Sequence, residues 1–294
     1  MTLKTLVIGD HSLDWGRRTI LMGILNITPD SFSGDGLAAA GDDFVARAVE
    51  RAGRFLAEGA ELLDIGGEST RPGARTVSED EEKRRVEPVI SAISSCFPNA
   101  LISIDTYKAS VAQIALEAGA RIVNDVWGLR ADPQMAAVVA RYGAPVILMH
   151  NRSKPNDVQV EARLGGRYVG VEYADLMADV QRELMESVAL ARAAGIPDEK
   201  IILDPGIGFG KTVQQNLELL NRLDEIRALG FPVLLGTSRK SFIGYTLDLP
   251  ADQRAAGTAA TVAIGIARGA DIVRVHDVAQ MSQVARMADA ITRR

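Results

Sequence analysis

Cysteine is almost absent from this chain of 294 residues, because Cys96 is the only one. An internal disulfide is therefore excluded, and so is a zinc site built on paired cysteines. The chain has only three histidines and no His-Glu-x-x-His motif, so the helical zinc site of metalloproteases has no support. Cys96 lies in the apolar stretch 89–97, where we expect a buried and unreactive thiol.

Long apolar runs and an excess of positive charge are also missing. No uncharged apolar run approaches the roughly 18 residues that a membrane-spanning helix needs, and residues 1–9 lack the apolar region of a signal peptide. The formal net charge is −5, which argues against broad nucleic-acid or membrane-surface binding, although local cations can still hold a small anionic ligand. A single cysteine fits a reducing compartment. We therefore expect a cytoplasmic protein without a nucleic-acid or membrane partner.

What the chain has instead is a repeated alternation of short apolar runs and amphipathic segments. The continuous apolar run 19–27 is typical of a strand buried on both faces, and segment 44–60 has apolar residues at helical spacing. Several helical segments end on a glycine just before the next apolar run, as helices commonly do. The expected strands are 19–27, 61–67, 101–106, 121–126, 145–150, 200–205, 232–236 and 271–276, and the expected helices are 44–60, 77–97, 109–118, 133–142, 173–194, 212–229, 254–268 and 279–292.

Eight strand–helix units with right-handed crossovers predict an α/β fold, a closed parallel (β/α)8 TIM barrel over residues 19–294. Residues 1–18 are expected to form a short N-terminal hairpin or plug, and a doubly wound open sheet is the alternative to the barrel. The long loops 28–43, 67–76 and 151–172 all follow strands, so they overhang one face as lids or as disordered insertions. Polar residues end the apolar runs, where barrel enzymes build their active sites: Asn26, Asp64, Asp105, Asn124, His150, Asp204, Lys240 and His276.

Seven motifs at these positions carry a resemblance to a known family. In order and chemistry they resemble dihydropteroate synthase, the folate-pathway enzyme that joins p-aminobenzoate to a pterin. The resemblance runs from about residue 19 to 278, and seven motifs in sequence order are far more specific than any one of them. They read NITPDSFSGDG (26–36), DIGGESTRPG (64–73), SIDT (103–106), VND (123–125), LDPGIGFGK (203–211), GTSRKSF (236–242) and RVHD (274–277).

The resemblance implies a pterin pocket at the strand ends. A pterin ring has a dense edge of hydrogen-bond donors and acceptors, which would cost several kcal/mol if buried unpaired. A carboxylate only accepts, whereas a carboxamide both donates and accepts. By resemblance, Asp105, Asn124 and Asp204 hold the pterin edge. Lys240 is expected to donate to the pterin carbonyl or a ring nitrogen, and Met149 to pack against the ring face.

The same resemblance implies a subsite for diphosphate and magnesium. Arg274 and His276 would bind the diphosphate, and Asn26 would be the protein ligand of Mg2+. The reaction breaks a methylene–oxygen bond and forms a methylene–nitrogen bond. If the first bond breaks before the second forms, an ionised Asp105 would stabilise the resulting pterin methylene cation. We therefore expect a dissociative displacement, with Asp105, Lys240, Arg274 and His276 as catalytic residues.

The second substrate, p-aminobenzoate, needs a flat slot and a site for its carboxylate. The resemblance assigns Thr70, Arg71 and Pro72 of the second loop to this slot. Ser241, with nearby backbone N–H groups at a helix start, would bind the carboxylate, and Phe209 would line the slot. Sulfonamides mimic p-aminobenzoate in this family.

Some polar residues have a structural interpretation instead. Asp64 is equally consistent with a hydrogen-bond partner inside the barrel, so we leave it out of the expected site. We interpret Asp125 as structural, and His150 as either a packed core histidine or a site residue. The segment Gly210-Lys211-Thr212 looks like the end of a phosphate-binding P-loop, but the required earlier glycine falls on Pro205.

Two departures from the family pattern leave details open. Asp35 stands one position later than in the common motif, so its role is undetermined. The segment 151–154 differs from the common form and is longer, so its contacts are undetermined as well. A methyltransferase domain that carries a methyl-folate to a corrinoid is the nearest rival. It would share the pterin edge but would not need Arg274 and His276 for a diphosphate. A pterin-binding protein without activity is the other rival, and it would be expected to lose some of the polar strand ends.

The segment 254–268 also predicts a partner. Both faces of this expected helix are small or apolar. One face would cover the barrel, and the other would meet a second copy of the chain by twofold symmetry. The resemblance likewise implies a homodimer, whereas tight packing within one chain is the alternative.

Overall fold

The barrel strands lie close to where the apolar runs predict them. The computed structural model describes residues 3–28, 44–70, 76–169 and 171–293. Eight parallel strands form one sheet in the order β10-β7-β6-β5-β4-β3-β12-β11. They are β3 (Ile20–Asn26), β4 (Leu62–Gly66), β5 (Leu101–Asp105), β6 (Ile122–Asp125), β7 (Val146–Met149), β10 (Ile201–Asp204), β11 (Leu234–Leu235) and β12 (Ile272–Val275).

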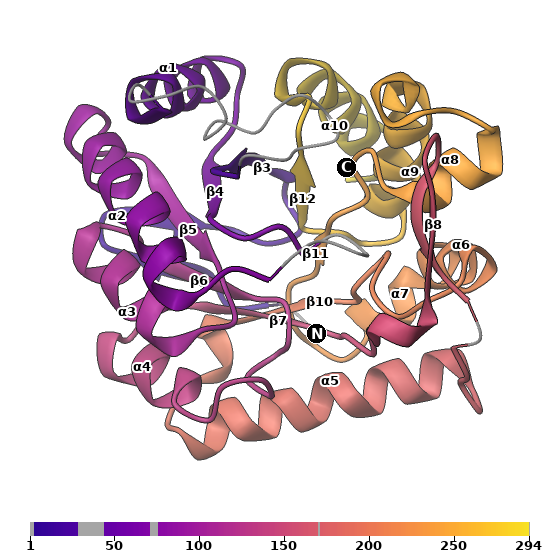
Figure 1. The fold of residues 1–294 in the computed structure, drawn as a ribbon, viewed down its shortest axis with the longest axis horizontal. Helices are drawn as coiled ribbons and strands as arrows, with labels where there is room; N and C mark the ends of the chain where they lie inside the picture. Colours follow the sequence, from indigo (N-terminus) through magenta and orange to yellow (C-terminus); the bar gives the residue numbers. More distant parts are fainter. Residues whose placement is uncertain (1–2, 29–43, 71–75, 170, 294) are drawn as a thin grey trace.

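The two outer strands of this sheet, β10 and β11, meet and close it. Leu203 of β10 forms a parallel bridge with Val233, which directly precedes β11. The N–H of Leu203 also donates to the carbonyl of Pro232 at 2.9 Å. Figure 1 shows the helices arranged around the closed sheet. The (β/α)8 fold class is therefore confirmed, and the open-sheet alternative is wrong.

The helices differ from the expectation in two places. The expected helix 212–229 is divided into two at Arg222, which has the non-helical angles φ −109° and ψ 25°. A further short helix, α8, follows β11. Among the described residues, no helix is long and apolar enough to cross a membrane. The helices are α1 (Phe44–Ala57), α2 (Glu79–Cys96), α3 (Ala109–Ala118), α4 (Met135–Tyr142), α5 (Leu176–Ala193), α6 (Val213–Asn221), α7 (Leu223–Arg227), α8 (Ser241–Leu247), α9 (Ala255–Ala267) and α10 (Val278–Thr292).

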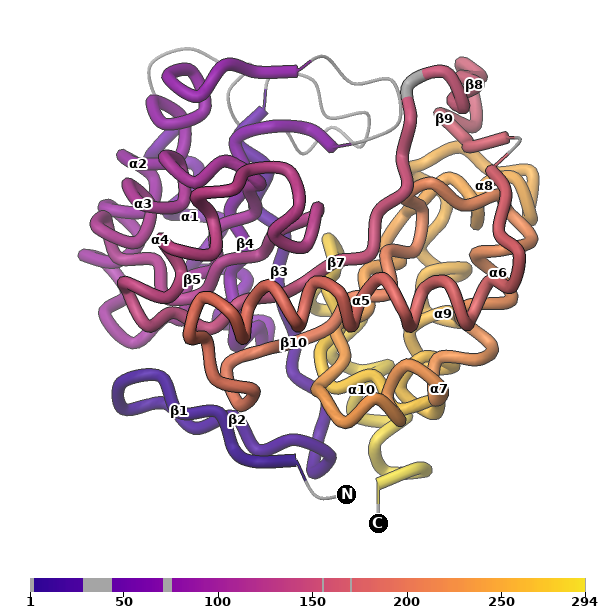
Figure 2. The backbone as a smooth tube through the Cα atoms, turned by 90° about the horizontal axis from the view of Figure 1, so that it is seen from below, coloured from indigo at the N-terminus to yellow at the C-terminus, as the bar shows by residue number. Residues whose placement is uncertain are grey.

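Two small antiparallel hairpins lie at opposite ends of the barrel (Figure 2). The first consists of β1 (Leu6–Ile8) and β2 (His11–Leu13), near the N-terminus. The second consists of β8 (Val158–Glu161) and β9 (Gly165–Tyr168), inside the segment that we expected only to be a long loop. The strands of this second hairpin are four residues long and mostly exposed, so their alternation is too short to stand out in the sequence.

Cys96 is exposed, so the expectation of a buried thiol is wrong. It is the last residue of α2, and its neighbour Ser95 is also exposed, whereas Ile93 faces the core. The apolar stretch around Cys96 belongs to an amphipathic helix, and Cys96 lies on its solvent side.

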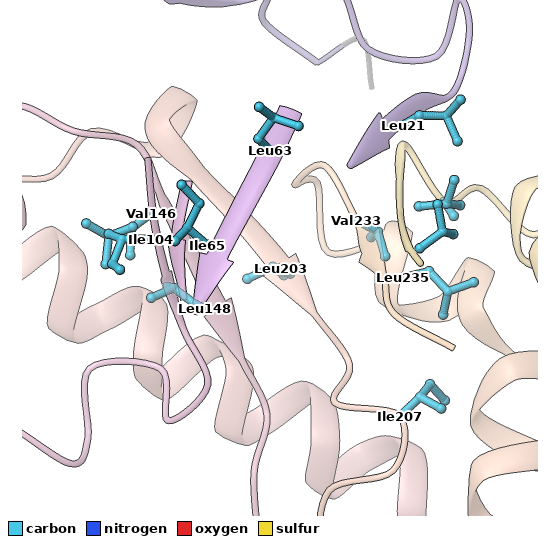
Figure 3. Close-up of a cluster of buried hydrophobic side chains, with 14 of the residues drawn as sticks. Leu21, Leu63, Ile65, Ile104, Val146, Leu148, Leu203, Ile207, Val233 and Leu235 are labelled. Atoms are coloured by element: carbon cyan, nitrogen blue, oxygen red, sulfur yellow. The ribbon is translucent and has the colours of Figure 1, made fainter. Parts of the chain in front are cut away.

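The apolar core has two layers separated by the barrel wall. Strand residues that point outward, such as Leu63, Ile65 and Ile104, pack against the surrounding helices (Figure 3). Residues that point inward near the amino ends of the strands form a second cluster, and the hairpin β1–β2 covers it. The members of this second cluster are Leu6, Ile8, Leu13, Ile20, Met22, Leu62, Leu101, Ile122, Ile147, Ile202, Leu234 and Ile272.

Toward the carboxyl ends of the strands, the inward-pointing side chains are polar instead of apolar. Residues two apart on a strand share a face, so the inward position two residues beyond Leu62 is Asp64. Hydrogen-bond register pairs Asp64 with Ser103 and then Asp105 with Asn124 on the neighbouring strands. The same spacing places Asp204 beyond Ile202 on β10, and Arg274 beyond Ile272 on β12. The inner apolar cluster thus lies directly below a ring of inward-pointing polar side chains at the carboxyl ends of the strands.

Candidate active site

Arg274 lies between two buried carboxylates from adjacent strands. Its Nε donates to Asp64 Oδ2 at 2.5 Å, and its Nη2 donates to Asp105 Oδ2 at 2.6 Å. Asn124 Nδ2 also donates to Asp64 Oδ2, at 3.1 Å. Asp64, which the sequence left undecided, is thus the residue that joins Arg274 to Asn124. We refer to Asp64, Asp105, Asn124, Asp204, Lys240 and Arg274 as the polar cluster.

Two acceptor atoms of the polar cluster are buried and unused. The Oδ1 atoms of Asp64 and Asp105 have no hydrogen-bond partner in the described part of the chain. A buried carboxylate oxygen without a donor is costly, and such atoms are rare in folded proteins. The cluster can therefore accept at least two hydrogen bonds from a bound molecule.

Burial and the neighbouring charges shift the pKa values of the residues in the polar cluster. Burial raises the pKa of Asp105 to about 7; Asp64 adds to this rise, while Arg274 opposes it. Burial lowers the pKa of Lys240 to about 8, although the carboxylates of Asp204 and Asp105 partly offset this. Burial also raises the pKa of Asp204. Two groups of opposite charge thus titrate near neutrality within one site, as is common in active sites.

Lys240 reaches the cluster across the loop that follows β10. Its ammonium donates to the carbonyl of Ile207 and lies 4.6 Å from the centre of the Phe209 ring. Gly208 makes room for it: at φ +83°, a Cβ there would lie 2.9 Å from Lys240 Cδ. Asp204 Oδ1 accepts from the N–H of Gly206 at 2.7 Å, which fixes the start of the same loop.

A buried lysine, Lys211, stabilises the loop after β10 through hydrogen bonds to its backbone. Lys211 is 1% exposed, and its ammonium donates to the carbonyls of Gly206 and Phe209 and to His150 Nδ1, at 2.9, 3.0 and 2.9 Å. His150 Nε2 then pairs with Glu183 Oε2 at 3.0 Å. Burial and the nearby Lys211 lower the pKa of His150 to about 3, so the imidazole is neutral and accepts from Lys211. No sequence motif indicated this role for Lys211, because a buried lysine has no spacing signature.

Replacing Lys211 with methionine is expected to lower the free energy of unfolding by about 3 kcal/mol, because two buried carbonyls and His150 lose their donor. Urea denaturation measures the change. Lys200→Met is the matched control, since Lys200 also donates to a carbonyl, that of Gly143 at 2.6 Å, but at the surface. We expect it to change stability by less than about 0.5 kcal/mol. Equal losses in the two variants would contradict a special role for Lys211.

The remaining expected site residues lie around the polar cluster or outside the described residues. His276 Nδ1 and its backbone N–H both pair with Ser238 Oγ, at 2.9 and 3.1 Å. Met149 is buried at the end of β7. Asn26 ends β3, and its register partner is Gly66, beside Asp105. Ser241 opens α8, and Thr70 is half-buried beyond β4, whereas Arg71, Pro72 and Asp35 lie outside the described residues.

Comparison with known proteins assigns the chain to a family. The profile of the pterin binding enzymes matches residues 22–276. The dihydropteroate synthase of Bacillus subtilis is 50% identical over 280 residues, which are 95% of this chain and 91% of that protein. The chain belongs to the dihydropteroate synthase family. The synthase of Clostridium beijerinckii is 49% identical, with 98% of this chain and 99% of that one covered.

Solved structures of other dihydropteroate synthases have the same fold. That of Yersinia pestis, in complex with a sulfonamide drug, matches with a TM-score of 0.88 and 40% identity over 98% of this chain and 99% of that one. That of Xanthomonas albilineans, with 4-aminobenzoic acid, matches with a TM-score of 0.85 and 40% identity over 99% and 98%. As a member of this family, the chain is a transferase that forms a carbon–nitrogen bond in folate biosynthesis.

Proposed function

We propose that the chain condenses 6-hydroxymethyl-7,8-dihydropterin diphosphate with p-aminobenzoate and releases diphosphate. The polar cluster is the observation that carries this proposal. Its two unused carboxylate oxygens suit the ring and exocyclic N–H donors of a pterin, and Asn124 adds a carboxamide. Asp204, at the end of β10, supplies an acceptor, and Lys240, directly before α8, supplies a donor. Met149 is an apolar surface for the ring face.

Arg274 would bind the diphosphate while it stays paired with the carboxylates of the polar cluster. In the structure, its Nε and Nη2 groups donate to the carboxylates of Asp64 and Asp105. Its guanidinium has five N–H donors, so others are left for a diphosphate oxygen. His276 adds a donor nearby, held by Ser238. This arrangement supports Arg274 and His276 as the diphosphate ligands. Arg274 would then be paired with both the diphosphate and Asp105.

Asn26 fits the expected Mg2+ ion. No group of three or more His, Cys, Asp or Glu in the described part of the chain could cage a metal ion. Magnesium does not need such a cage, because it keeps several waters and takes its other ligands from substrate phosphates. One carboxamide oxygen at the end of β3 is therefore a sufficient protein ligand. Bound there, Mg2+ would neutralise charge on the leaving diphosphate.

Asp105 suits a dissociative displacement. An aromatic amine is nucleophilic when neutral, so no strong base is needed if the carbon–oxygen bond breaks first. A carboxylate with a raised pKa, held on one oxygen by Arg274, can instead stabilise positive charge on the pterin methylene with its free oxygen. We therefore propose that the carbon–oxygen bond breaks before the carbon–nitrogen bond forms.

The p-aminobenzoate slot would lie beside Lys240. Phe209 is already next to the Lys240 ammonium, and Ser241 directly follows Lys240 in the chain. Thr70 would close the slot from β4, together with Arg71 and Pro72. The Xanthomonas albilineans relative binds 4-aminobenzoic acid and the Yersinia pestis relative binds a sulfonamide. We propose that this chain binds both classes of molecule in this slot.

We also propose a cytoplasmic homodimer. Helices α9 and α10 pack side by side and carry exposed apolar side chains: Ile264 is 48% exposed, Met287 62% and Ile291 63%. An exposed apolar patch of this kind is typical of a protein–protein interface. It extends the expected contact from segment 254–268 to the neighbouring helix. A monomeric mass in sedimentation velocity would contradict the dimer.

The assay that tests the function supplies the pterin diphosphate, p-aminobenzoate and Mg2+ and measures diphosphate release together with the coupled product. We expect stoichiometric formation of both, competition by a sulfonamide against p-aminobenzoate, and loss of activity on chelation of Mg2+. Asn26→Ala is expected to raise the Mg2+ concentration needed for half-maximal rate about tenfold, because one inner ligand is lost. Methyl transfer from a methyl-folate to a corrinoid, without diphosphate release, would instead favour the rival methyltransferase.

A further inference from the structure

Arg239, the residue directly before Lys240, has an unusual backbone conformation. Its φ is +55°, in the left-handed region that favours glycine. For a residue with a Cβ this conformation costs free energy, so the surrounding structure must hold it in place. Arg239 lies between β11 and α8, and the direction of the chain at this point decides where Lys240 and Ser241 lie.

Three neighbouring residues fix Arg239 on every side. Its N–H donates to Thr258 Oγ1 at 3.0 Å, and its carbonyl accepts from Arg254 Nη1 at 3.0 Å. Its side chain forms a two-pronged contact with Asp277, Nε to Oδ2 at 3.0 Å and Nη2 to Oδ1 at 2.5 Å. Both backbone polar groups and the guanidinium are thus held by residues from the start of α9, the residue directly before it, and the turn after β12.

Arg254 is the centre of this arrangement. It is 3% exposed, and its guanidinium donates to three carbonyls from separate segments: Leu249 at 3.0 Å, Arg239 at 3.0 Å and Leu164 at 2.9 Å. The planar fork of a guanidinium can span three such acceptors, whereas an ammonium cannot reach them all. Gly244 in α8 leaves the space for it, because a Cβ there would lie 2.1 Å from Arg254 Nη2.

Leu164 brings the hairpin β8–β9 into the same arrangement. Leu164 precedes β9, and next to it the carbonyl of Gly165 accepts from the hydroxyl of Tyr245 on α8 at 3.0 Å. Arg163 donates to the carbonyl of Asp248 at 2.9 Å. Figures 1 and 2 show the hairpin beside α8. The insertion is thus attached to the helix that begins immediately after Lys240.

We propose that Arg254, Thr258 and Asp277 are positioning residues that hold Arg239 in its left-handed conformation and so direct Lys240 into the polar cluster, with the hairpin β8–β9 completing this support through the carbonyl of Leu164. The inference rests on the proposed part of Lys240 in the reaction. The contacts of Arg254, Thr258 and Asp277 fix the backbone directly before Lys240. The carbonyl of Ile207 accepts a hydrogen bond from the ammonium at the other end of the side chain. Loss of the support frees the lysine to leave the cluster without removing any group that touches substrate.

The test is a double-mutant cycle between Thr258→Val, which deletes only the acceptor of the Arg239 N–H, and Arg239→Gly. Glycine adopts positive φ at little cost, so it no longer needs the support. We expect Thr258→Val alone to lower kcat about tenfold, because the lysine is misplaced, and to change it by less than about twofold when residue 239 is glycine. Arg254→Lys is expected to lower kcat like Thr258→Val. Thr246→Val in α8 is the control, since it loses only a bond to the carbonyl of Phe242, and it should leave kcat unchanged.

A second readout is independent of turnover. Competitive acetylation of the whole protein, read by peptide mass spectrometry across pH, reports the apparent pKa and the reactivity of Lys240. In Thr258→Val and Arg254→Lys, both should move toward the values of an ordinary exposed lysine, and in Thr246→Val they should not. Equal kcat loss from Thr258→Val with arginine or glycine at 239, or unchanged labelling of Lys240, would overturn the inference. If the wild type released no diphosphate, the labelling alone would still decide it, and only the proposed function would have failed.

Discussion

Arg274→Met is expected to reduce kcat/KM at least about 10³-fold and to lower the free energy of unfolding by about 3–5 kcal/mol. The size of the stability loss follows from the two buried carboxylates that Arg274 joins, with Asp64 0% exposed and its side chain paired at 2.5 Å. Without the guanidinium, Asp64 and Asp105 lose the cation that they share. The activity loss has a separate cause, because the diphosphate loses a proposed ligand. Urea denaturation and steady-state kinetics measure the two effects.

A second substitution separates these causes. In the double variant Arg274→Met with Asp64→Asn, one of the two unpaired negative charges is removed, so we expect about half of the lost stability to return. Activity should stay low, because the cation is still missing. Arg227→Met is the control: it breaks the pair between Arg227 and the buried Asp271, 2.9 Å apart at the amino end of β12, and should lower stability without changing kcat/KM. Recovery of activity in the double variant would contradict a direct role for Arg274.

The position of the polar cluster could be predicted from the sequence because all strands of a parallel barrel run in the same direction. All its strands end at the same edge, so a polar residue at the end of each apolar run faces the same space. Asn124 and Asp204 illustrate this, since each points inward two positions beyond an inward apolar residue, Ile122 or Ile202. The pattern needs only local information, the length of each run and the residue that ends it.

Contacts between distant segments could not be predicted in the same way. The pairing of Asp64 with Arg274 joins residues 210 positions apart, and nothing in either motif indicates it. The sequence therefore left Asp64 undecided and assigned Arg274 to the diphosphate alone. The hydrogen bonds of Lys211 depend on a loop that turns back over its own start, which run lengths do not encode. The hairpin β8–β9 was missed because its strands are short and lie outside the barrel.

The pH dependence of the reaction follows from the two shifted groups of the cluster. If the ionised form of Asp105 stabilises the methylene cation, activity requires a pH above its pKa of about 7. If charged Lys240 binds the pterin, activity requires a pH below its pKa of about 8. The profile of kcat/KM against pH is therefore expected to be a narrow bell, rising through about 7 and falling through about 8.

Asp105→Asn should remove the acidic limb of that bell and lower kcat about 10²–10³-fold, since a carboxamide has the same shape but cannot stabilise a cation electrostatically. The basic limb should remain and move to lower pH, because the negative charge of Asp105 helps to raise the pKa of Lys240. Ser103→Ala is the matched control: Ser103 lies two residues earlier on β5, faces the same side, and its hydroxyl has no hydrogen-bond partner in the described residues, so both limbs should persist. A wild-type secondary isotope effect near unity at the pterin methylene, or an acidic limb that survives in Asp105→Asn, would exclude the cation that gives Asp105 its proposed role.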